Sequence, residues 1–301
     1  MGITGYSYSW FLLSFFVLIP TLEAHIAKYD EYWKARELEA TENLNKAYHP
    51  NPEENRKRLA DCAPGFARGT VGGKDGKFYM VTNPSDDIAN PKPETLRHAF
   101  ARNVIIHGLH IHHIKPANGG MIRDAENHIG LRTASDGDGI SLFGATNIWL
   151  DHLSLYDCSD GLIDVIQGST AITISNCHFT DHTDVMLFGA SDSYVADEKM
   201  QITVALNHFG KGLGNRYSAS GSYVTKEVTS RGYLPPEQWK KWNWVSQGDQ
   251  FKNGAYFTPS GDPNASKLFG TNKMMPFQPG QFVHKLTRYA GTVHCRIGRP
   301  C

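Results

Sequence analysis

The sequence predicts an all-β fold, a right-handed, single-stranded parallel β-helix, from three observations. First, four strand-like segments rich in β-branched and apolar residues align without gaps, at residues 103–111, 147–155, 171–179 and 201–209. Second, a shorter motif that ends in glycine recurs at spacings of 24 and 21 residues, at 140–144, 164–168 and 185–189. Third, the two sets alternate with no helical pattern between them, which indicates two strand types per turn of a stacked coil.

Stacking of the turns predicts which side chains meet. Equivalent residues on neighbouring turns of such a coil lie about 4.8 Å apart. We therefore expect His178 to lie over His208, and Phe179 over Phe209. A Greek-key sandwich is the alternative fold, but its hairpins need Asn-Gly or Asp-Gly pairs between strands, and these are scarce here.

The chain is expected to divide into four segments. The apolar run Phe11–Pro20 is too short to span a bilayer and has the length typical of a secretory signal, which predicts a signal peptide at residues 1–24. A membrane anchor or a buried helix is the alternative. Residues 25–60 are expected to form a helical N-terminal segment, 61–230 the β-helix with its metal site, and 231–301 a C-terminal segment that packs on the β-helix.

The balanced charge of the chain limits the classes of partner that it can bind. Thirty Lys and Arg residues balance thirty Asp and Glu residues, so no overall field recruits nucleic acid or, after signal cleavage, a membrane. We expect a monomer.

Secretion permits disulfides, and Cys295 and Cys301 are the expected pair, while Cys62, Cys158 and Cys177 retain at least one free thiol. Because Cys158 and Cys177 lie in strand-like text, they are interpreted as buried thiols.

Four carboxylates stand out in "DGDGISLFGATNIWLDHLSLYDCSDGLID", residues 136–164. Asp136 and Asp160 are one period apart, so adjacent turns bring them together, and Asp138 and Asp164 share a face with them wherever the chain is extended. Two unit charges 4 Å apart repel by about 4 kcal/mol at an effective dielectric near 20. Ca²⁺ relieves this repulsion and tolerates irregular carboxylate geometry. Solvated aspartates that cap turns are the alternative interpretation.

The same stretch, extended through "VIQGSTAITISNCHFTDHTDVMLFGASDSY", resembles the core of the plant-type pectate lyases of polysaccharide lyase family one. Upstream "NRKRLADCAPGFARGTVGGKDGKFYMVTNPSDD" and downstream "WKKWNWVSQGDQFKNGAYFTPSG" and "CRIGRPC" agree, so the resemblance covers most of Tyr29 to Cys301. It implies a pectin lyase-like β-helix, secretion to the cell wall, and Ca²⁺-dependent β-elimination of de-esterified homogalacturonan (polygalacturonate). It also implies Asp136, Asp160 and Asp164 as calcium ligands, with Asp138 as a further ligand.

The resemblance fails at the family's catalytic base. In the family this base is the first arginine of an Arg-x-Pro-x-x-Arg-x-Gly motif that follows "NHFG". After Asn207–Gly210 this chain reads "KGLGNRYSASGSYVTKEVTSRGY", without that motif, as if a block were missing between Leu213 and Gly214. Arg216 lies at the right linear distance from Asp164 and is the candidate base, with a surface arginine as the alternative. A second block is missing between His98 and Asn103, so the β-helix is predicted to be shortened.

The sequence is compatible with three functions. The leading hypothesis is a Ca²⁺-dependent pectate lyase. The alternative is a catalytically impaired pseudoenzyme that binds calcium and acidic pectin, because the arginine motif is absent. A glycoside hydrolase is the third, since the aspartates could supply its two carboxylates. A zinc site at His107, His110, His112 and His113 is disfavoured because no Cys or carboxylate accompanies them at ligand spacing. Trp239, Trp242 and Trp244 are expected to pack over the coil.

Overall fold

The structure is a computed structural model. It describes residues 56–72, 74–75, 79–85, 92–96, 103–125, 128–191, 193–213, 216–217, 223–224, 226–229, 235–265, 274–275 and 277–292. The predicted signal peptide, the N-terminal segment before residue 56, and the expected Cys295–Cys301 pair lie outside these residues. Among the described residues, no helix has both the length and the apolar character needed to cross a bilayer.

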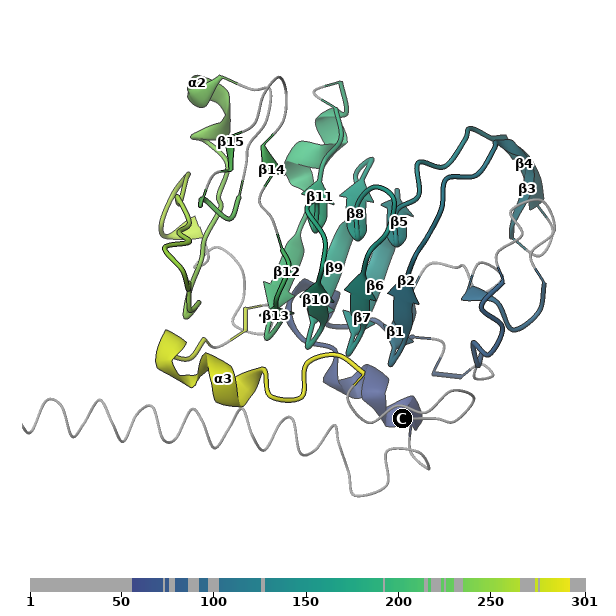
Figure 1. Cartoon of the computed structure of the whole chain (residues 1–301), viewed down its shortest axis with the longest axis horizontal. Helices are drawn as coiled ribbons and strands as arrows, with labels where there is room; N and C mark the ends of the chain where they lie inside the picture. Colours follow the sequence, from purple (N-terminus) through teal and green to yellow (C-terminus); the bar gives the residue numbers. More distant parts are fainter. Residues whose placement is uncertain are drawn as a thin grey trace, which may run out of the picture. The chain divides into compact units, whose positions relative to one another are not determined.

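Three parallel sheets form the body of the molecule and run side by side along the coil (Figure 1). The first contains β1 (Val104–His107), β6 (Thr146–Asp151), β9 (Thr170–Ser175) and β12 (Ile202–Ala205). The second contains β2 (His110–His112), β7 (Ser154–Tyr156), β10 (His178–Thr180) and β13 (His208–Phe209). The third contains β5 (Ile140–Phe143), β8 (Ile163–Ile166) and β11 (Met186–Phe188). The predicted parallel β-helix is therefore confirmed.

The predicted ladders are confirmed at residue level. His178 pairs with His208 and Phe179 with Phe209 across β10 and β13. The two phenylalanine rings stack with centroids 5.2 Å apart at 26°, and the two imidazole rings lie 4.9 Å apart. Like side chains thus repeat at the strand spacing, as stacked turns require.

The prediction of one strand per nine-residue segment was wrong, because each segment forms two. The chain bends at a residue with positive φ in every copy: Gly108 (68°), His152 (51°), Asn176 (53°) and Leu206 (58°). A residue in the left-handed region interrupts the extended ladder and redirects the chain. Each complete coil therefore has three strands rather than two. Histidine and leucine conceal this bend in the sequence because neither signals left-handed backbone as glycine does.

The predicted spacing of the shorter motif was also wrong. Ile140 lies beside Ile163, and Ile163 beside Met186, so both spacings are 23 residues rather than 24 and 21. The prediction aligned the terminal glycines, but the turn after β8 contains Gln167 and Gly168, both with positive φ. Turn length varies between coils while strand register does not, so the glycines are poor markers of register.

The core lies inside the coil and is almost entirely aliphatic. Its fully buried members come from all three sheets and the turns between them: Leu150, Leu153, Leu155, Leu162, Ile163, Val165, Ile172, Ile174, Cys177 and Phe179. Burying each large side chain contributes about 1.5 to 3 kcal/mol. Cys158 and Cys177 are buried without a disulfide, which confirms their interpretation as buried thiols, and Cys62 is also free.

The remaining elements surround this coil. An antiparallel hairpin, β3 (Gly120–Ala125) and β4 (His128–Arg132), interrupts the chain between β2 and β5, and β14 (Arg216–Tyr217) pairs antiparallel with β15 (Tyr223–Val224). The short helices are η1 (Arg56–Cys62), η2 (Gly65–Ala67), η4 (Val195–Lys199), α2 (Pro236–Trp239), η6 (Gly280–Phe282) and α3 (Val283–Leu286). The ring centroids of Trp244 and Phe188 in β11 lie 6.4 Å apart, so the chain contacts the coil at this tryptophan.

Candidate metal centre

The four predicted aspartates lie where the chain enters two neighbouring strands. Asp136 and Asp138 precede β5, Asp160 precedes β8, and Asp164 lies within β8 beside Ser141. One carboxylate oxygen from each of Asp136, Asp138 and Asp160 lies within 4.8 Å of the others. Asp164 lies beside this group, because its Oδ1 and Oδ1 of Asp138 both face Gly161. The structure thus brings all four carboxylates together from adjacent coils.

Gly161 makes this approach possible. Its N–H donates to Oδ1 of Asp138 at 2.7 Å. A Cβ atom on this residue would lie only 2.7 Å from Oδ1 of Asp164 and 3.0 Å from Oδ1 of Asp138. Ser141 donates its hydroxyl to the other oxygen of Asp138 at 2.8 Å. Sequence reasoning missed Gly161 and Ser141, although "DG" repeats at residues 136–139 and 160–161.

The carboxylates of the cluster disfavour one another's ionised forms. Burial, followed by the charges of Asp138, Asp160 and Asp136, raises the pKa of Asp164 to about 8. Burial is also the main cause that raises the pKa of Asp138, despite its hydrogen bonds from Ser141 and Gly161. Among the described residues, the charged neighbours that act on Asp164 are carboxylates, so ionising it is costly unless a cation is present.

The donor set fits Ca²⁺. It consists of oxygen atoms alone, and its members come from turn segments as well as from a strand. Calcium accepts six to eight oxygen ligands in irregular geometry, which such an arrangement can provide. Exposed Asp184 adds negative charge near Asp160, and the His182 imidazole contacts the Asp160 carbonyl. Both residues were missed from the sequence and border the centre on the side of the next coil.

The candidate base is placed only in part. Arg216 opens β14, where its backbone pairs with Val224. Its side chain lies outside the described residues. Its role therefore remains a prediction.

The four histidines considered as a zinc site do not converge on one point, although His112 and His113 contact each other through their Nδ1 atoms at 2.6 Å. His110 contacts the hydroxyl of Thr292, and His112 stacks on Tyr156 with ring centroids 4.6 Å apart. His113 pairs with Asp157, whereas His107 turns toward Asp151. They do not form one joint site, although His107 takes part in a separate cluster described below.

A parallel β-helix that carries a cluster of carboxylates is a candidate cation-binding protein. Comparison with known proteins makes the assignment specific. A family model for the pectate lyase N terminus matches residues 25–61, and a pectate lyase model matches residues 100–214. The chain belongs to the pectate lyase family.

Individual relatives agree with this assignment. A probable pectate lyase P59 of Solanum lycopersicum is 38% identical, and the match covers 98% of each chain. A pectate lyase of Lilium longiflorum is also 38% identical, over 96% of this chain and 98% of the relative. The crystal structure of jun a 1, the major allergen from cedar pollen, superimposes with a TM-score of 0.67 at 33% identity, covering 81% of this chain and 96% of the allergen.

Alignment length supports the predicted shortening. The match to the tomato relative extends over 442 positions, but this chain has only 301 residues. At least 141 of those positions therefore face gaps in this chain. The loss of internal residues leaves the carboxylate cluster and the ladders around it in place.

Proposed function

We propose that this chain is a Ca²⁺-dependent pectate lyase that cleaves de-esterified homogalacturonan by β-elimination in the plant cell wall, after secretion. Family membership supports lyase activity. The observation that carries the calcium proposal is the convergence of Asp136, Asp138, Asp160 and Asp164, in which burial and neighbouring carboxylates raise the pKa of Asp164 to about 8.

The substrate explains why such a centre is useful. β-Elimination removes the proton on C5 of a uronate, beside a carboxylate that is already negative, so this proton is only weakly acidic. A calcium ion held by Asp136, Asp138, Asp160 and Asp164 would neutralise charge on the substrate carboxylate and would stabilise the developing enolate. Ser141 and the Gly161 N–H hold Asp138 in a fixed orientation, which preorganises one ligand before substrate arrives.

Arg216 is proposed as the base that removes the C5 proton. An arginine is normally too basic for this role, so its surroundings must favour the neutral form in the complex with substrate. Its linear distance from Asp164 supports the proposal. Arg216→Ala is expected to abolish elimination while calcium binding persists. Arg288→Ala, which removes an exposed arginine beside Tyr289, is the control.

The function is tested with the purified mature chain on polygalacturonate, with calcium or with a chelator. Calcium-dependent growth of the ultraviolet absorbance of the 4,5-unsaturated product is expected. Asp160→Asn and Asp164→Asn should each reduce the rate by about 100-fold. Asp157→Asn changes an exposed aspartate of the same turn and should leave the rate unchanged.

Other results of this assay would replace the proposal. Polygalacturonate binding without product identifies a catalytically impaired protein. New reducing ends without the absorbance of an unsaturated sugar indicate hydrolysis instead of elimination.

A further inference from the structure

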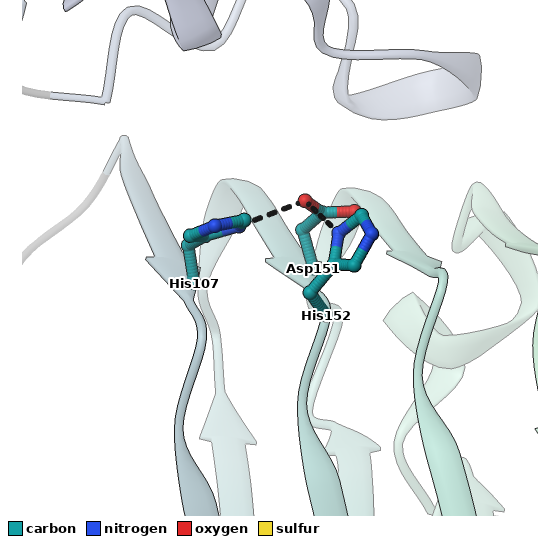
Figure 2. Close-up of side chains that lie close together, drawn as sticks. All are labelled: His107, Asp151 and His152. Atoms are coloured by element: carbon teal, nitrogen blue, oxygen red, sulfur yellow. Dashed lines mark hydrogen bonds and ion pairs between the residues drawn. The ribbon is translucent and has the colours of Figure 1, made fainter. Parts of the chain in front are cut away.

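A second cluster of metal-ligand side chains lies at the ends of β1 and β6, in a different sheet from the carboxylate centre. His107 is the last residue of β1 and pairs with Asp151, the last residue of β6; His152 follows directly. Nδ1 of His107 and Nδ1 of His152 lie 2.9 Å and 2.7 Å from the same oxygen, Oδ2 of Asp151. Figure 2 shows His107, at the end of β1, and His152, directly after β6, both linked to the Asp151 carboxylate.

Buried hydrogen-bond donors hold the Asp151 carboxylate through its other oxygen. Oδ1 of Asp151 accepts hydrogen bonds from the Ser175 hydroxyl at 3.1 Å and the Asn176 amide at 2.9 Å. The Trp149 indole N–H donates in turn to Ser175 at 2.8 Å. Because these groups hold Oδ1, Oδ2 is the oxygen presented to the two imidazoles. Ligands in metal sites are oriented in this way by outer hydrogen bonds.

Burial makes positive charge at this point favourable. The Asp151 side chain is fully buried, while those of His107 and His152 are 16% and 18% exposed. A buried carboxylate must be compensated by donors or by a cation. Two imidazole N–H groups can provide this compensation, and so can one divalent ion. The partly exposed rings leave the cluster within reach of solvent.

We propose that His107, Asp151 and His152 bind a divalent first-row transition-metal ion, with Zn²⁺ as the reference ion. Two imidazole nitrogens and one carboxylate oxygen, all within 4.8 Å of one another, match a ligand set used by zinc and by other ions of this series. Nitrogen donors distinguish this site from the all-oxygen centre. The proposal does not depend on pectate lyase activity.

Such an ion would have a structural role as well. Among the strands that the structure describes, β1 is at the end of its sheet and pairs with β6. An ion shared by His107 and Asp151 would join these two strands at their ends. Zinc is therefore expected to raise the melting temperature of the wild-type chain.

The test is a calorimetric titration of the full mature chain with Zn²⁺, in saturating Ca²⁺ so that the carboxylate centre is occupied. We expect one zinc ion per chain, with affinity reduced about 100-fold in His107→Gln and in His152→Gln. His284→Gln, which removes an exposed imidazole from α3, should bind zinc as the wild type does. Co²⁺ should bind at the same stoichiometry and show visible absorption bands that His107→Gln abolishes.

Three results would overturn the proposal. One is the absence of saturable zinc binding, which would leave the cluster as a purely hydrogen-bonded arrangement. Another is equal zinc affinity in His107→Gln and the wild type. The last is displacement of zinc by excess calcium, which would place the ion among the aspartates. Retained calcium binding by His107→Gln shows that the variant is folded, so its loss of zinc affinity then counts as support.

Discussion

Asp164 and Asp151 are both partly or wholly buried aspartates of the same coil, yet their surroundings act in opposite directions. Burial and three neighbouring carboxylates raise the pKa of Asp164 to about 8. Burial alone would also raise the pKa of Asp151, but hydrogen bonds from His107 and His152 outweigh it and hold this pKa well below its usual range. The fold itself stabilises the charge of Asp151, whereas the charge of Asp164 depends on an added cation.

Asp151→Ala is expected to have the largest effect. It removes the acceptor of the hydrogen bonds from His107, His152, Ser175 and Asn176, and the last two of these donors are buried. Breaking such a buried network costs about 3 to 5 kcal/mol. Urea unfolding in the presence of a chelator measures this loss. The control is Asp157→Asn, at an exposed aspartate; equal losses in the two variants would contradict the contrast drawn above.

Gly161→Ala is expected to have the second-largest effect, at the carboxylate centre. Its new methyl group must push apart the oxygens of Asp138 and Asp164, at a cost of about 1 to 3 kcal/mol. Calcium affinity should fall because the carboxylates no longer converge. Gly120→Ala provides a matched control, since a Cβ there meets no atom within 4 Å. Calorimetric calcium titrations of both variants check the prediction; unchanged affinity in Gly161→Ala would refute it.

When no calcium is present, Asp164→Asn should stabilise the folded chain, whereas Asp151→Ala should destabilise it. Because the folded-state pKa is about 8 and the unfolded value about 3.8, the unfolded chain binds fewer protons between these values. Stability of the wild type therefore falls as pH rises from about 4 to about 8. The amide removes this dependence and should stabilise the calcium-free chain at pH 7 by about 1 to 2 kcal/mol. Melting curves of the chelator-treated wild type and variant at several pH values check this prediction. The same dependence of stability on pH in both proteins would contradict it.

Two serine variants should produce the smallest and most selective differences. Ser175→Ala removes a donor to Asp151 and the acceptor of Trp149, so it should destabilise the chain by about 1 kcal/mol or more. Ser141→Ala removes a donor to Asp138 and should weaken calcium binding by about 10-fold with little change in stability. Calcium titration and urea unfolding of both variants separate the two roles. If both variants change only stability, Ser141 does not organise the calcium centre.

The sequence predicted the features that repetition determines. Strand periodicity gave the stacked ladders, including His178 over His208, and the same repetition placed Asp136 near Asp160. The bends at His152 and Leu206 could not be predicted, because left-handed backbone at such residues is imposed by the coil around them. The hairpin β3–β4 was missed because it interrupts the repeat instead of continuing it.

The candidate centres were accessible to different degrees. Four of the six aspartates in residues 136–164 drew attention to the candidate calcium centre, but its steric requirement at Gly161 appears only when the two coils are superimposed. The aligned segments already placed His107 opposite Asp151, so this contact could have been found in the sequence. The convergence of His152 on the same oxygen could not, because it depends on the bend at that residue.

The bend at Leu206 offers a route to engineering a more heat-resistant chain. The corresponding bends at Gly108 and Asn176 use the two residue types that tolerate left-handed backbone best. A bulky aliphatic residue held at a φ of 58° stores strain that an asparagine at the same place would release. One codon change at this corner would make the polypeptide a more durable scaffold without altering either group of candidate ligands.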